Sequence, residues 1–299
     1  MSSFVRPRRS VLYMPGSNAR ALEKARSLPA DAIIIDLEDA VAPDAKAGAR
    51  EQVALDLSRG GFGPREVVVR VNGADTPWFF DDLARFAEAS AAGWALDALL
   101  IPKISDPETL LAAGRRLDAL GASASLKLWA MIETPLAVLK ALDIALAGRN
   151  PAARLAVLVL GTNDLAKETG AHIVPGRAPM AGWLSQCVLA ARAGGVEVLD
   201  GVWNNFRDME GFARECGEAD ALGFDGKTLI HPTQIAPCNA AFTPPEAEIA
   251  EARMLIEVFD RPENAAKGVL QVEGRMYERM HADIARKRVA LADAIAARG

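Results

Sequence analysis

Cysteine and histidine are both scarce in this chain of 299 residues. The three cysteines form no CxxC pair and the three histidines form no HExxH pair; they are Cys187, Cys216 and Cys238, and His172, His231 and His281. This usage predicts no disulfide framework and no zinc site, and it fits a protein of the reducing cytoplasm. Any metal is therefore expected to be held by oxygen ligands rather than by imidazole.

Long apolar runs and clusters of basic residues are absent as well. No apolar run approaches the length of a membrane-spanning helix, and Val11–Met14, which follows the basic N-terminus, is far too short for a signal peptide. The net charge is −5 and the basic residues are scattered, so we expect neither nucleic acid nor a membrane surface as a partner.

Short apolar runs do recur, and each is followed by a segment with helical spacing of its apolar residues. The eight runs are Ser10–Tyr13, Ala32–Asp36, Glu66–Val71, Ala98–Ile101, Leu126–Ile132, Ala156–Leu160, Val196–Leu199 and Ala221–Phe224. The clearest helical segments are Ser17–Leu28, Trp78–Ala92, Asp106–Leu120 and Pro135–Leu146. Eight strand–helix units in a chain of this length predict an α/β fold, the (β/α)8 TIM barrel.

The barrel is expected to occupy residues 1–241, and residues 242–299 are expected to form a C-terminal helical extension. Pro232–Ala241 reads as a short helix, and Glu246–Phe259 and Gly274–Ala297 read as longer ones, with the apolar run Val269–Val272 between them. A closed barrel does not need this extension, so it is either a packing appendage or a lid. Small residues near Gly268 and Gly274 would permit hinges.

Two of the predicted strands end in a carboxylate. Glu133 follows the run Leu126–Ile132, and Asp164 follows Ala156–Leu160 across the turn Gly161-Thr162-Asn163. Neighbouring parallel strands lie about 4.8 Å apart, so the two carboxylates would meet at one end of the sheet and suit Mg²⁺. The alternative is that each carboxylate caps the helix that follows it.

Other charged residues also fall at the predicted C-terminal ends of strands, where barrel enzymes place their active sites. Glu38 and Asp39 add negative charge, which requires a cation or an arginine partner. Arg70 could bind a substrate carboxylate bidentately, or it could pair with Glu38 or Asp39. Lys103 could neutralise the same acids, and we interpret it first as a structural residue.

Seven stretches, in order along the chain, together resemble one family. They are RSVLYMPG (Arg9–Gly16), DLEDAV (Asp36–Val41), RVN (Arg70–Asn72), PK (Pro102–Lys103), IETP (Ile132–Pro135), GTNDLAKE (Gly161–Glu168) and FDGKTLIHP (Phe224–Pro232). They resemble the HpcH/HpaI aldolase and citrate lyase β-subunit family, and in particular its stand-alone acyl-CoA lyases, which include malyl-CoA and citramalyl-CoA lyases.

The resemblance implies a Mg²⁺-dependent enzyme on a TIM barrel that forms a homotrimer or a hexamer. By motif, Glu133 and Asp164 would bind the Mg²⁺ ion, and Glu133 would thereby contact the substrate. Arg70 would bind the carboxylate of a 2-oxo acid and stabilise developing charge. Glu38 and Asp39 would act in catalysis by orienting Arg70 and water at the metal.

Five further residues would contact the substrate if the motifs correspond. Tyr13, Arg20 and Lys24 fall where the family contacts substrate and coenzyme A phosphates, with Arg20 in place of the more usual lysine. Ile230 and His231 fall in the loop beside the bound thioester.

The C-terminal extension departs from the family pattern. Where full-length lyases carry a motif resembling G-x-M-I-D-x-P with a catalytic Asp, this chain reads GRMYERM from Gly274 to Met280, with Glu278 at the Asp position. We predict that Glu278 is the catalytic acid or base and lies on a lid that closes over a neighbouring subunit's barrel. The alternative is a solvated residue paired with Arg275 or Arg279.

The expected reaction is the cleavage or formation of a 3-hydroxyacyl-CoA such as malyl-CoA or citramalyl-CoA. Cleavage would give an acyl-CoA and a 2-oxo acid, which is glyoxylate or pyruvate. Formation would start from the same two compounds. Alternatives are a thioesterase on malyl-CoA-like substrates, a citrate-lyase-type subunit within a complex, and a pyruvate aldolase that uses no coenzyme A.

Overall fold

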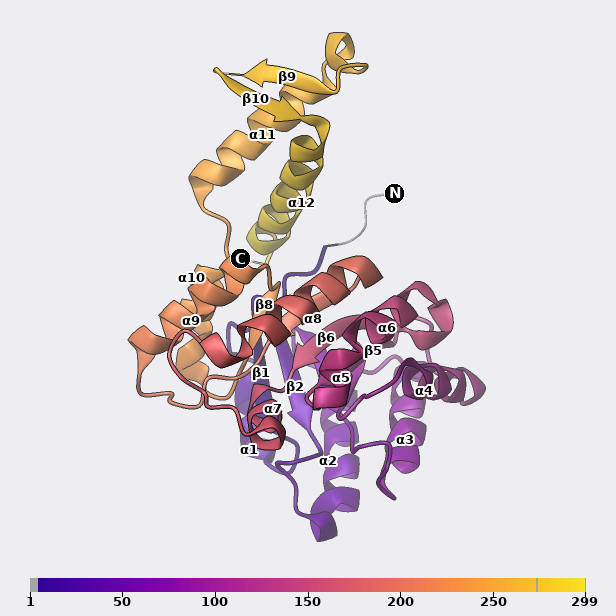
Figure 1. Ribbon diagram of the computed structural model, residues 1–299. Coiled ribbons are helices and arrows are strands. Elements are labelled where there is room, and N and C mark those ends of the chain that lie inside the picture. The colour runs from indigo at the N-terminus through magenta and orange to yellow at the C-terminus, as the bar shows by residue number, and fades with distance from the viewer. Residues whose placement is uncertain (1–4, 273, 299) are drawn as a thin grey trace. The chain divides into compact units, whose positions relative to one another are not determined.

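A computed structural model describes residues 5–272 and 274–298. The chain divides into two compact units, Arg8–Phe242 and the part from Thr243 onward, to which the few residues before Arg8 also belong. The larger unit is a closed barrel of eight parallel strands in chain order, with its helices outside the strands (Figure 1). The predicted (β/α)8 fold is confirmed.

The first seven predicted strands overlap observed ones. The strands are β1 Ser10–Pro15, β2 Ala32–Asp36, β3 Glu66–Arg70, β4 Ala98–Ile101, β5 Lys127–Ile132, β6 Leu155–Leu160, β7 Glu197–Asp200 and β8 Gly226–Leu229. The barrel closes where Ser10 of β1 pairs with Lys227 of β8. Apolar runs therefore located every strand of the barrel except the eighth.

The prediction for the eighth strand was wrong. Ala221 and Leu222 belong to the end of a helix, and Gly223 ends that helix in the left-handed conformation with φ 93°. The true strand, Gly226–Leu229, contains Lys227, which is fully buried because Asp200 and Glu215 pair with it. An apolar-run criterion misses a strand whose core residue is a paired lysine.

The helices of the barrel unit follow the predicted alternation. They are α1 Ala19–Ala25, α2 Lys46–Arg59, α3 Phe79–Ala91, α4 Pro107–Ala119, α5 Pro135–Leu139, α6 Ala141–Leu146, α7 Thr162–Thr169, α8 Ala181–Gly194, α9 Met209–Leu222 and α10 Ile235–Ala241. The first is shorter than predicted because Asn18 caps it by accepting the Ala21 N–H at 3.1 Å. The predicted helix Pro135–Leu146 is interrupted at Lys140.

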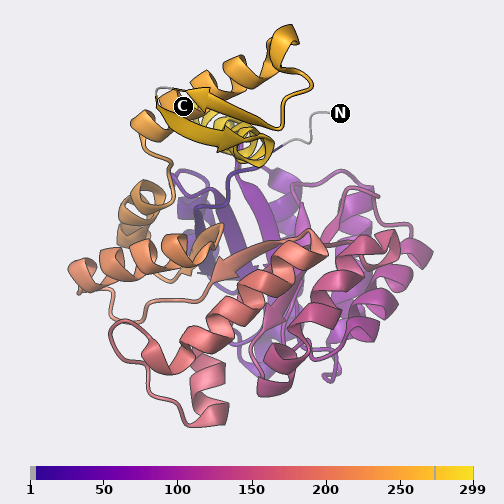
Figure 2. The same cartoon turned by 45° about the horizontal axis from the view of Figure 1, so that its top comes forward.

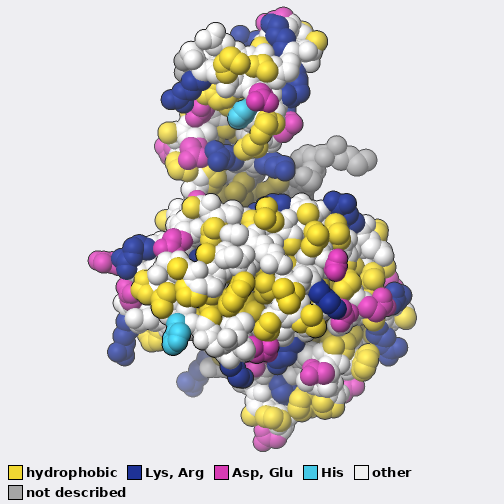
Figure 3. Space-filling view, in the orientation of Figure 1, with side chains coloured by type: hydrophobic (Ala, Val, Ile, Leu, Met, Phe, Trp, Pro, Cys, Tyr) yellow, Lys and Arg dark blue, Asp and Glu magenta, His cyan; other side chains and the backbone are white. Residues whose placement is uncertain are grey.

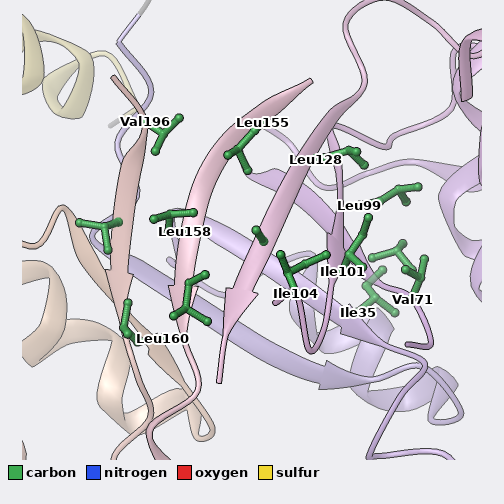
Figure 4. Packing of buried hydrophobic residues seen from close by; sticks show 14 of the residues in the cluster. Ile35, Val71, Leu99, Ile101, Ile104, Leu128, Leu155, Leu158, Leu160 and Val196 are labelled. Atoms are coloured by element: carbon green, nitrogen blue, oxygen red, sulfur yellow. The ribbon is translucent and has the colours of Figure 1, made fainter. Parts of the chain in front are cut away.

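The core of the barrel unit consists of two clusters. One fills the inside of the barrel and consists of Val11, Ala32, Ile34, Val68, Ala98, Leu100, Trp129, Met131, Val157, Val159 and Leu199. The other lies between the strands and the surrounding helices, where side chains such as Ile35, Leu99 and Leu158 leave the opposite face of the strands (Figure 4). The alternation along each strand decides which side chains face the interior.

The C-terminal unit was predicted to be helical, but the structure shows that it also contains two strands. Its elements are α11 Glu246–Asp260, β9 Val269–Val272, β10 Arg275–Glu278 and α12 Arg279–Ala296. The predicted helix from Gly274 begins only at Arg279, because Arg275–Glu278 pairs antiparallel with Val269–Val272 after a turn at Gly274, φ 81°. The hairpin lies beside α11 and α12, which pack through Ala252, Leu255 and Ala285 (Figure 2).

The surface of the barrel unit carries acidic and basic side chains intermixed with hydrophobic ones on the face shown in Figure 3. Among the described residues, no helix has both the length and the apolar character that crossing a membrane requires.

Candidate active site

The inward-facing positions at the C-terminal ends of the strands form a polar layer above the apolar barrel core. Val11, Ile34 and Val68 face the interior, so the residues two positions later, Tyr13, Asp36 and Arg70, face it one layer higher. On β5 the same alternation runs through Trp129 and Met131 to Glu133. The layer is therefore set by strand register and not by loop conformation.

A cavity of about 410 Å³ opens over this layer. It is lined by Tyr13, Met14, Pro15, Asp36, Asp39, Ala40, Arg70, Met131, Leu160, Gly161, Thr162, Asn163, Asp164, Val202, Thr228 and Ile230. Its position at the C-terminal ends of the strands is the one at which (β/α)8 enzymes carry out their chemistry.

Arg70 holds the acids of this layer together. Its Nε and Nη2 each donate to Asp36, at 2.7 Å, in a bidentate pair. Its Nη1 lies 2.8 Å from Glu38 Oε2 and 3.3 Å from Asp39 Oδ2, and its guanidinium lies 5.2 Å from the centre of the Tyr13 ring. One side chain thus contacts three carboxylates, so the predicted pairing with Glu38 and Asp39 is present.

Asp36 is a principal partner of Arg70 that was not among the predicted site residues. The signal was available in principle, because Asp36 and Arg70 are the last residues of neighbouring strands and are paired in register. Their side chains leave the sheet side by side, and an acid beside an arginine inside a barrel will form an ion pair.

Glu133 and Asp164 are brought to the same end of the barrel. Glu133 is 1% exposed, and its Oε1 accepts the Lys103 backbone N–H at 2.7 Å. Burial, followed by the negative charge of Glu38, raises the pKa of Glu133 to about 8, and Asp164 contributes in the same direction. Asp164 is half-buried in the first turn of α7 and lines the cavity.

These two acids fit a divalent cation. Burial and the negative charge of Glu38 disfavour the ionised form of Glu133, and a bound cation would offset both effects. Among residues 5–272 and 274–298, no group of three or more His, Cys, Asp or Glu side chains is arranged for a metal. The site therefore offers two carboxylates, a number that Mg²⁺ commonly takes from a protein while water and substrate complete its shell.

The capping alternative does not hold for Glu133. Thr134 is the N-cap of α5, and its hydroxyl accepts the Ala137 N–H at 3.1 Å. The Glu133 carboxylate packs instead against Gly161, where an added Cβ would collide with Glu133 Cβ and lie 2.8 Å from its Oε2. The glycine is needed so that the β6–α7 junction can pass close to this acid.

Lys103 pairs with Glu38, as the structural interpretation of this lysine expected. Its Nζ donates to Glu38 Oε1 at 2.8 Å while its backbone N–H bonds Glu133. Lys103 is one of the few non-glycine residues with positive φ, at 54°. Burial raises the pKa of Glu38, and Arg70 and Lys103 oppose that shift, so Glu38 is held between the two cations.

The residues expected to contact coenzyme A lie at the edge of this region. Arg20 and Lys24 are exposed one turn apart on α1, the helix that follows Tyr13 and Pro15. Ile230 lines the cavity and is 41% exposed. His231 does not line it; it caps the short turn Pro232–Gln234 and stacks on Phe206 at 4.9 Å.

Glu278 lies in the C-terminal unit, at the N-cap of α12. It forms a capping box with His281, whose Nδ1 is 2.9 Å from the Glu278 backbone nitrogen. The Arg279 guanidinium donates to the backbone carbonyls of Asn264, Ala265 and Lys267. Glu278 is exposed, as a residue that acts on another surface must be.

A buried ion cluster lies at β7 and β8. Asp200 accepts from Arg177 Nη1 at 2.7 Å and from Lys227 Nζ at 2.7 Å, and Lys227 also donates to Glu215 at 2.7 Å. Two acids and two bases balance in charge. Asp200 is the last residue of β7 and Lys227 the second residue of β8, and the two side chains bind each other.

Barrel proteins with a polar cavity at the C-terminal ends of their strands are typically enzymes that use this face for catalysis, and this chain has that construction. Residues 9–232 match the family model described as HpcH/HpaI aldolase/citrate lyase. The chain belongs to this family, as its motifs had indicated.

Relatives and solved structures agree with this assignment. A "(3S)-malyl-CoA thioesterase" of Cereibacter sphaeroides strain KD131 is 48% identical over 99% of both chains. A "citrate lyase subunit beta" of Leuconostoc mesenteroides subsp. cremoris is 32% identical over 92% of this chain and 89% of its own. The structure of CitE from Mycobacterium tuberculosis with magnesium, acetoacetate and coenzyme A is 28% identical, with a TM-score of 0.71, over 95% of this chain and 97% of that one.

Proposed function

We propose that this protein acts, with Mg²⁺, on the coenzyme A thioester of a short 3-hydroxy acid that carries a second carboxylate, such as malyl-CoA. The observation that supports this most directly is the placement of Asp164 and Arg70 on one cavity at the barrel mouth, with Glu133 buried against Gly161 of the cavity wall. Two acids provide for a hard cation, and the arginine provides for a carboxylate.

In this proposal Glu133 and Asp164 hold the ion. A bound Mg²⁺ polarises substrate oxygen atoms and offsets the negative charge that develops on them. The residues of the chain do the rest: Asp36 and Glu38 keep the Arg70 guanidinium fixed beside the cavity. A substrate carboxylate would replace the longest of its carboxylate contacts, the one at 3.3 Å to the exposed Asp39 side chain. The solved relative with magnesium, acetoacetate and coenzyme A supports the same combination of ligands.

Coenzyme A would approach along β1, α1 and the β8 loop. Arg20 and Lys24 are exposed cations on one face of α1 and suit the phosphates of the cofactor portion, and Ile230 offers an apolar contact at the cavity rim. A pyruvate aldolase that uses no coenzyme A would have no use for the two cations.

Thioester hydrolysis is the reaction we favour. A relative that spans 99% of both chains at 48% identity is named a (3S)-malyl-CoA thioesterase. The carbon–carbon lyase expected from the sequence is the second candidate, supported by the citrate lyase β subunits among the relatives. The two reactions need the same ion and the same carboxylate site. In the thioesterase reaction water attacks the thioester carbon, whereas in the lyase reaction the C2–C3 bond breaks.

The test is an assay with malyl-CoA and citramalyl-CoA in which free coenzyme A and 2-oxo acid are measured separately. Hydrolysis releases coenzyme A and the free hydroxy acid, whereas cleavage releases glyoxylate or pyruvate and leaves the thioester intact. Release of neither product by wild-type protein with Mg²⁺, from these or related acyl chains, would contradict the proposal. That result would favour the alternative that the protein is a subunit of a larger complex.

A further inference from the structure

The hydroxyl of Tyr13 stands out on the wall of the cavity. Its oxygen is buried and has no hydrogen-bond partner among the residues that the structure describes, although the Tyr13 side chain lines the cavity. The ring is fixed, because it lies on β1 and stacks with the Arg70 guanidinium at 5.2 Å. A buried polar group without a partner is unfavourable, so we expect a ligand to supply the missing partner.

Several other side-chain donors on the same wall are already engaged. Arg70 donates to Asp36 and contacts Glu38 and Asp39. Asn163 exchanges hydrogen bonds with Asn204, and the Thr228 hydroxyl donates to the Asp200 carbonyl at 3.0 Å. The Tyr13 hydroxyl is therefore ready to donate without breaking any bond of the protein.

We propose that Tyr13 is a catalytic residue whose hydroxyl donates a hydrogen bond to the thioester carbonyl oxygen as that oxygen becomes negative. This inference rests on the proposed function, since it needs a thioester in the cavity. A phenol is protonated at neutral pH and is a donor there, whereas the neighbouring Asp36 and Glu38 can only accept when ionised. The charge that needs a donor is the one that develops on oxygen.

The same oxygen gains charge in both candidate reactions. In hydrolysis, a water oxygen bonds to the thioester carbon and the carbonyl π electrons move onto oxygen; the C–S bond then breaks, sulfur takes the pair and a proton from the water, and the acid loses its other proton to solvent. In cleavage, a base takes the C3 hydroxyl proton, the O–H pair forms the C3=O bond of the 2-oxo acid, and the C2–C3 pair forms the enolate. The enolate is then protonated at C2 from solvent. Tyr13 keeps its proton throughout and only shares it.

The first test is Tyr13→Phe, which keeps the ring on Arg70 and removes only the hydroxyl. We expect kcat to fall about 10²- to 10³-fold, as for the loss of one oxyanion donor, with little change in KM. An unchanged thermal unfolding profile verifies the fold. An unchanged kcat, or a rise in KM alone, overturns the proposal, because a ground-state contact would have only that effect.

A second test reads the contact directly. The chain has two tyrosines, and Tyr277 lies in the C-terminal unit, where its hydroxyl bonds Glu251 at 2.5 Å. In a Tyr277→Phe background, 3-fluorotyrosine labels Tyr13 alone. We expect its ¹⁹F resonance to shift with dethia-malyl-CoA, which retains a carbonyl, and to shift much less with coenzyme A. Equal responses to both ligands contradict the proposed contact.

The two hypotheses fail in different ways. Wild-type protein that turns over no 3-hydroxyacyl-CoA refutes the proposed function. Wild-type protein that is active while Tyr13→Phe keeps the same kcat refutes only the role of Tyr13.

Discussion

At the scale of single residues, the metal pair makes the simplest prediction. Glu133→Ala or Asp164→Ala should abolish Mg²⁺ binding and turnover while the fold remains. Glu133 is buried and burial raises its pKa to about 8, so the protein alone does not favour an ionised group there, and its removal should not unfold the barrel. Calorimetric titration with Mg²⁺ measures the binding, and circular dichroism verifies the fold. Full activity of either variant in the presence of EDTA would show that the pair is not a metal site.

Arg70 makes the second prediction at this scale. Arg70→Lys keeps the charge but loses the planar group that holds both oxygens of Asp36. We expect kcat/KM to fall by an amount equivalent to about 2–4 kcal/mol in transition-state stabilisation. If the enzyme cleaves carbon–carbon bonds, the loss in the synthetic direction should fall on the 2-oxo acid.

Unchanged kinetics in Arg70→Lys would assign Arg70 a purely structural role. The variant would then show lower stability without a lower rate, since Asp36 and Glu38 would still have lost contacts. Denaturant unfolding of the same preparation separates these two outcomes.

How far single residues can be predicted depends on what determines their position. Arg70 ends a strand that the apolar pattern predicts, and Glu133 comes directly after another. Their place at the barrel mouth can therefore be predicted from the sequence. The pairing of Arg70 with Asp36 needs the strand register as well, which the sequence reading did not include. The absence of a hydrogen-bond partner for the Tyr13 hydroxyl could not be predicted, because it depends on how the surrounding polar groups bond to one another in the folded protein.

At the scale of elements, the junction of β6 and α7 controls the metal pair. Gly161→Ala places a methyl group against Glu133, since an added Cβ would lie 2.8 Å from Oε2. We expect the carboxylate to be displaced and Mg²⁺ affinity to fall at least tenfold, because a displacement of about 1 Å at such a site is already costly. Mg²⁺ titration measures this effect.

Gly182 in α8 provides the matched control. An added Cβ there meets nothing within 4 Å, and the residue lies in a helix. Gly182→Ala should leave Mg²⁺ affinity unchanged and should not lower stability, because Gly182 is the second residue of the helix and an alanine fits there. If Gly161→Ala behaves in the same way as Gly182→Ala, the close packing at Glu133 does not matter for the ion.

The strand β8 depends on its buried lysine. Lys227→Met removes one of the two cations that Asp200 and Glu215 share, and breaking a buried pair from one side costs about 3–5 kcal/mol. Urea unfolding of the variant and the wild type measures the difference. A loss below 1 kcal/mol would mean that Arg177 alone compensates both acids.

The same cluster makes stability depend on pH. Burial opposes ionisation of Asp200, but Lys227 and then Arg177 outweigh it, so the pKa of Asp200 is lowered. A group whose pKa is lower in the folded state stabilises the protein above its unfolded value of about 3.9, and that stabilisation is lost as the pH falls through the folded value. The loss of stability below about pH 4 should be smaller in Lys227→Met than in the wild type.

Elements were predictable where local pattern and burial agree. Apolar runs located β1 to β7, but β8 is polar inside the core and was placed too early. In the C-terminal unit, Arg275–Glu278 continues the helical pattern of the following residues yet forms β10, because Val269–Val272 is available as its partner. A hairpin depends on contacts between segments, which the pattern within one segment does not reveal.

At the scale of the whole molecule, the remaining prediction concerns assembly. A homotrimer or hexamer was expected from the family resemblance, and light scattering after size-exclusion chromatography measures it. The C-terminal unit beyond Phe242 is compact by itself, with its own apolar contacts between α11 and α12. A unit of that kind can act on a neighbouring subunit without being part of its own barrel.

We predict that Glu278 supplies a catalytic carboxylate to a neighbouring subunit. It is exposed at the start of α12, directly after β10, so the hairpin fixes the backbone that presents it. The competing interpretation is that Glu278 serves only to cap α12. Glu278→Asp distinguishes the two, because Asp is at least as good a cap but its carboxylate is one methylene shorter. A cap alone predicts unchanged activity, whereas a catalytic carboxylate moved by about 1 Å predicts a loss of about a hundredfold in rate.

Subunit mixing tests whether the carboxylate acts between subunits. Glu133→Ala lacks one of the two proposed metal ligands, and Glu278→Ala lacks the proposed catalytic carboxylate. Each homomer should therefore be inactive. In a mixed oligomer, one interface would combine an intact barrel mouth with an intact Glu278, and part of the activity should return. Absence of recovery in mixed oligomers verified by native mass spectrometry would exclude action between subunits. A fully active Glu278→Ala homomer would remove Glu278 from the mechanism and leave the acid–base work to the barrel mouth itself.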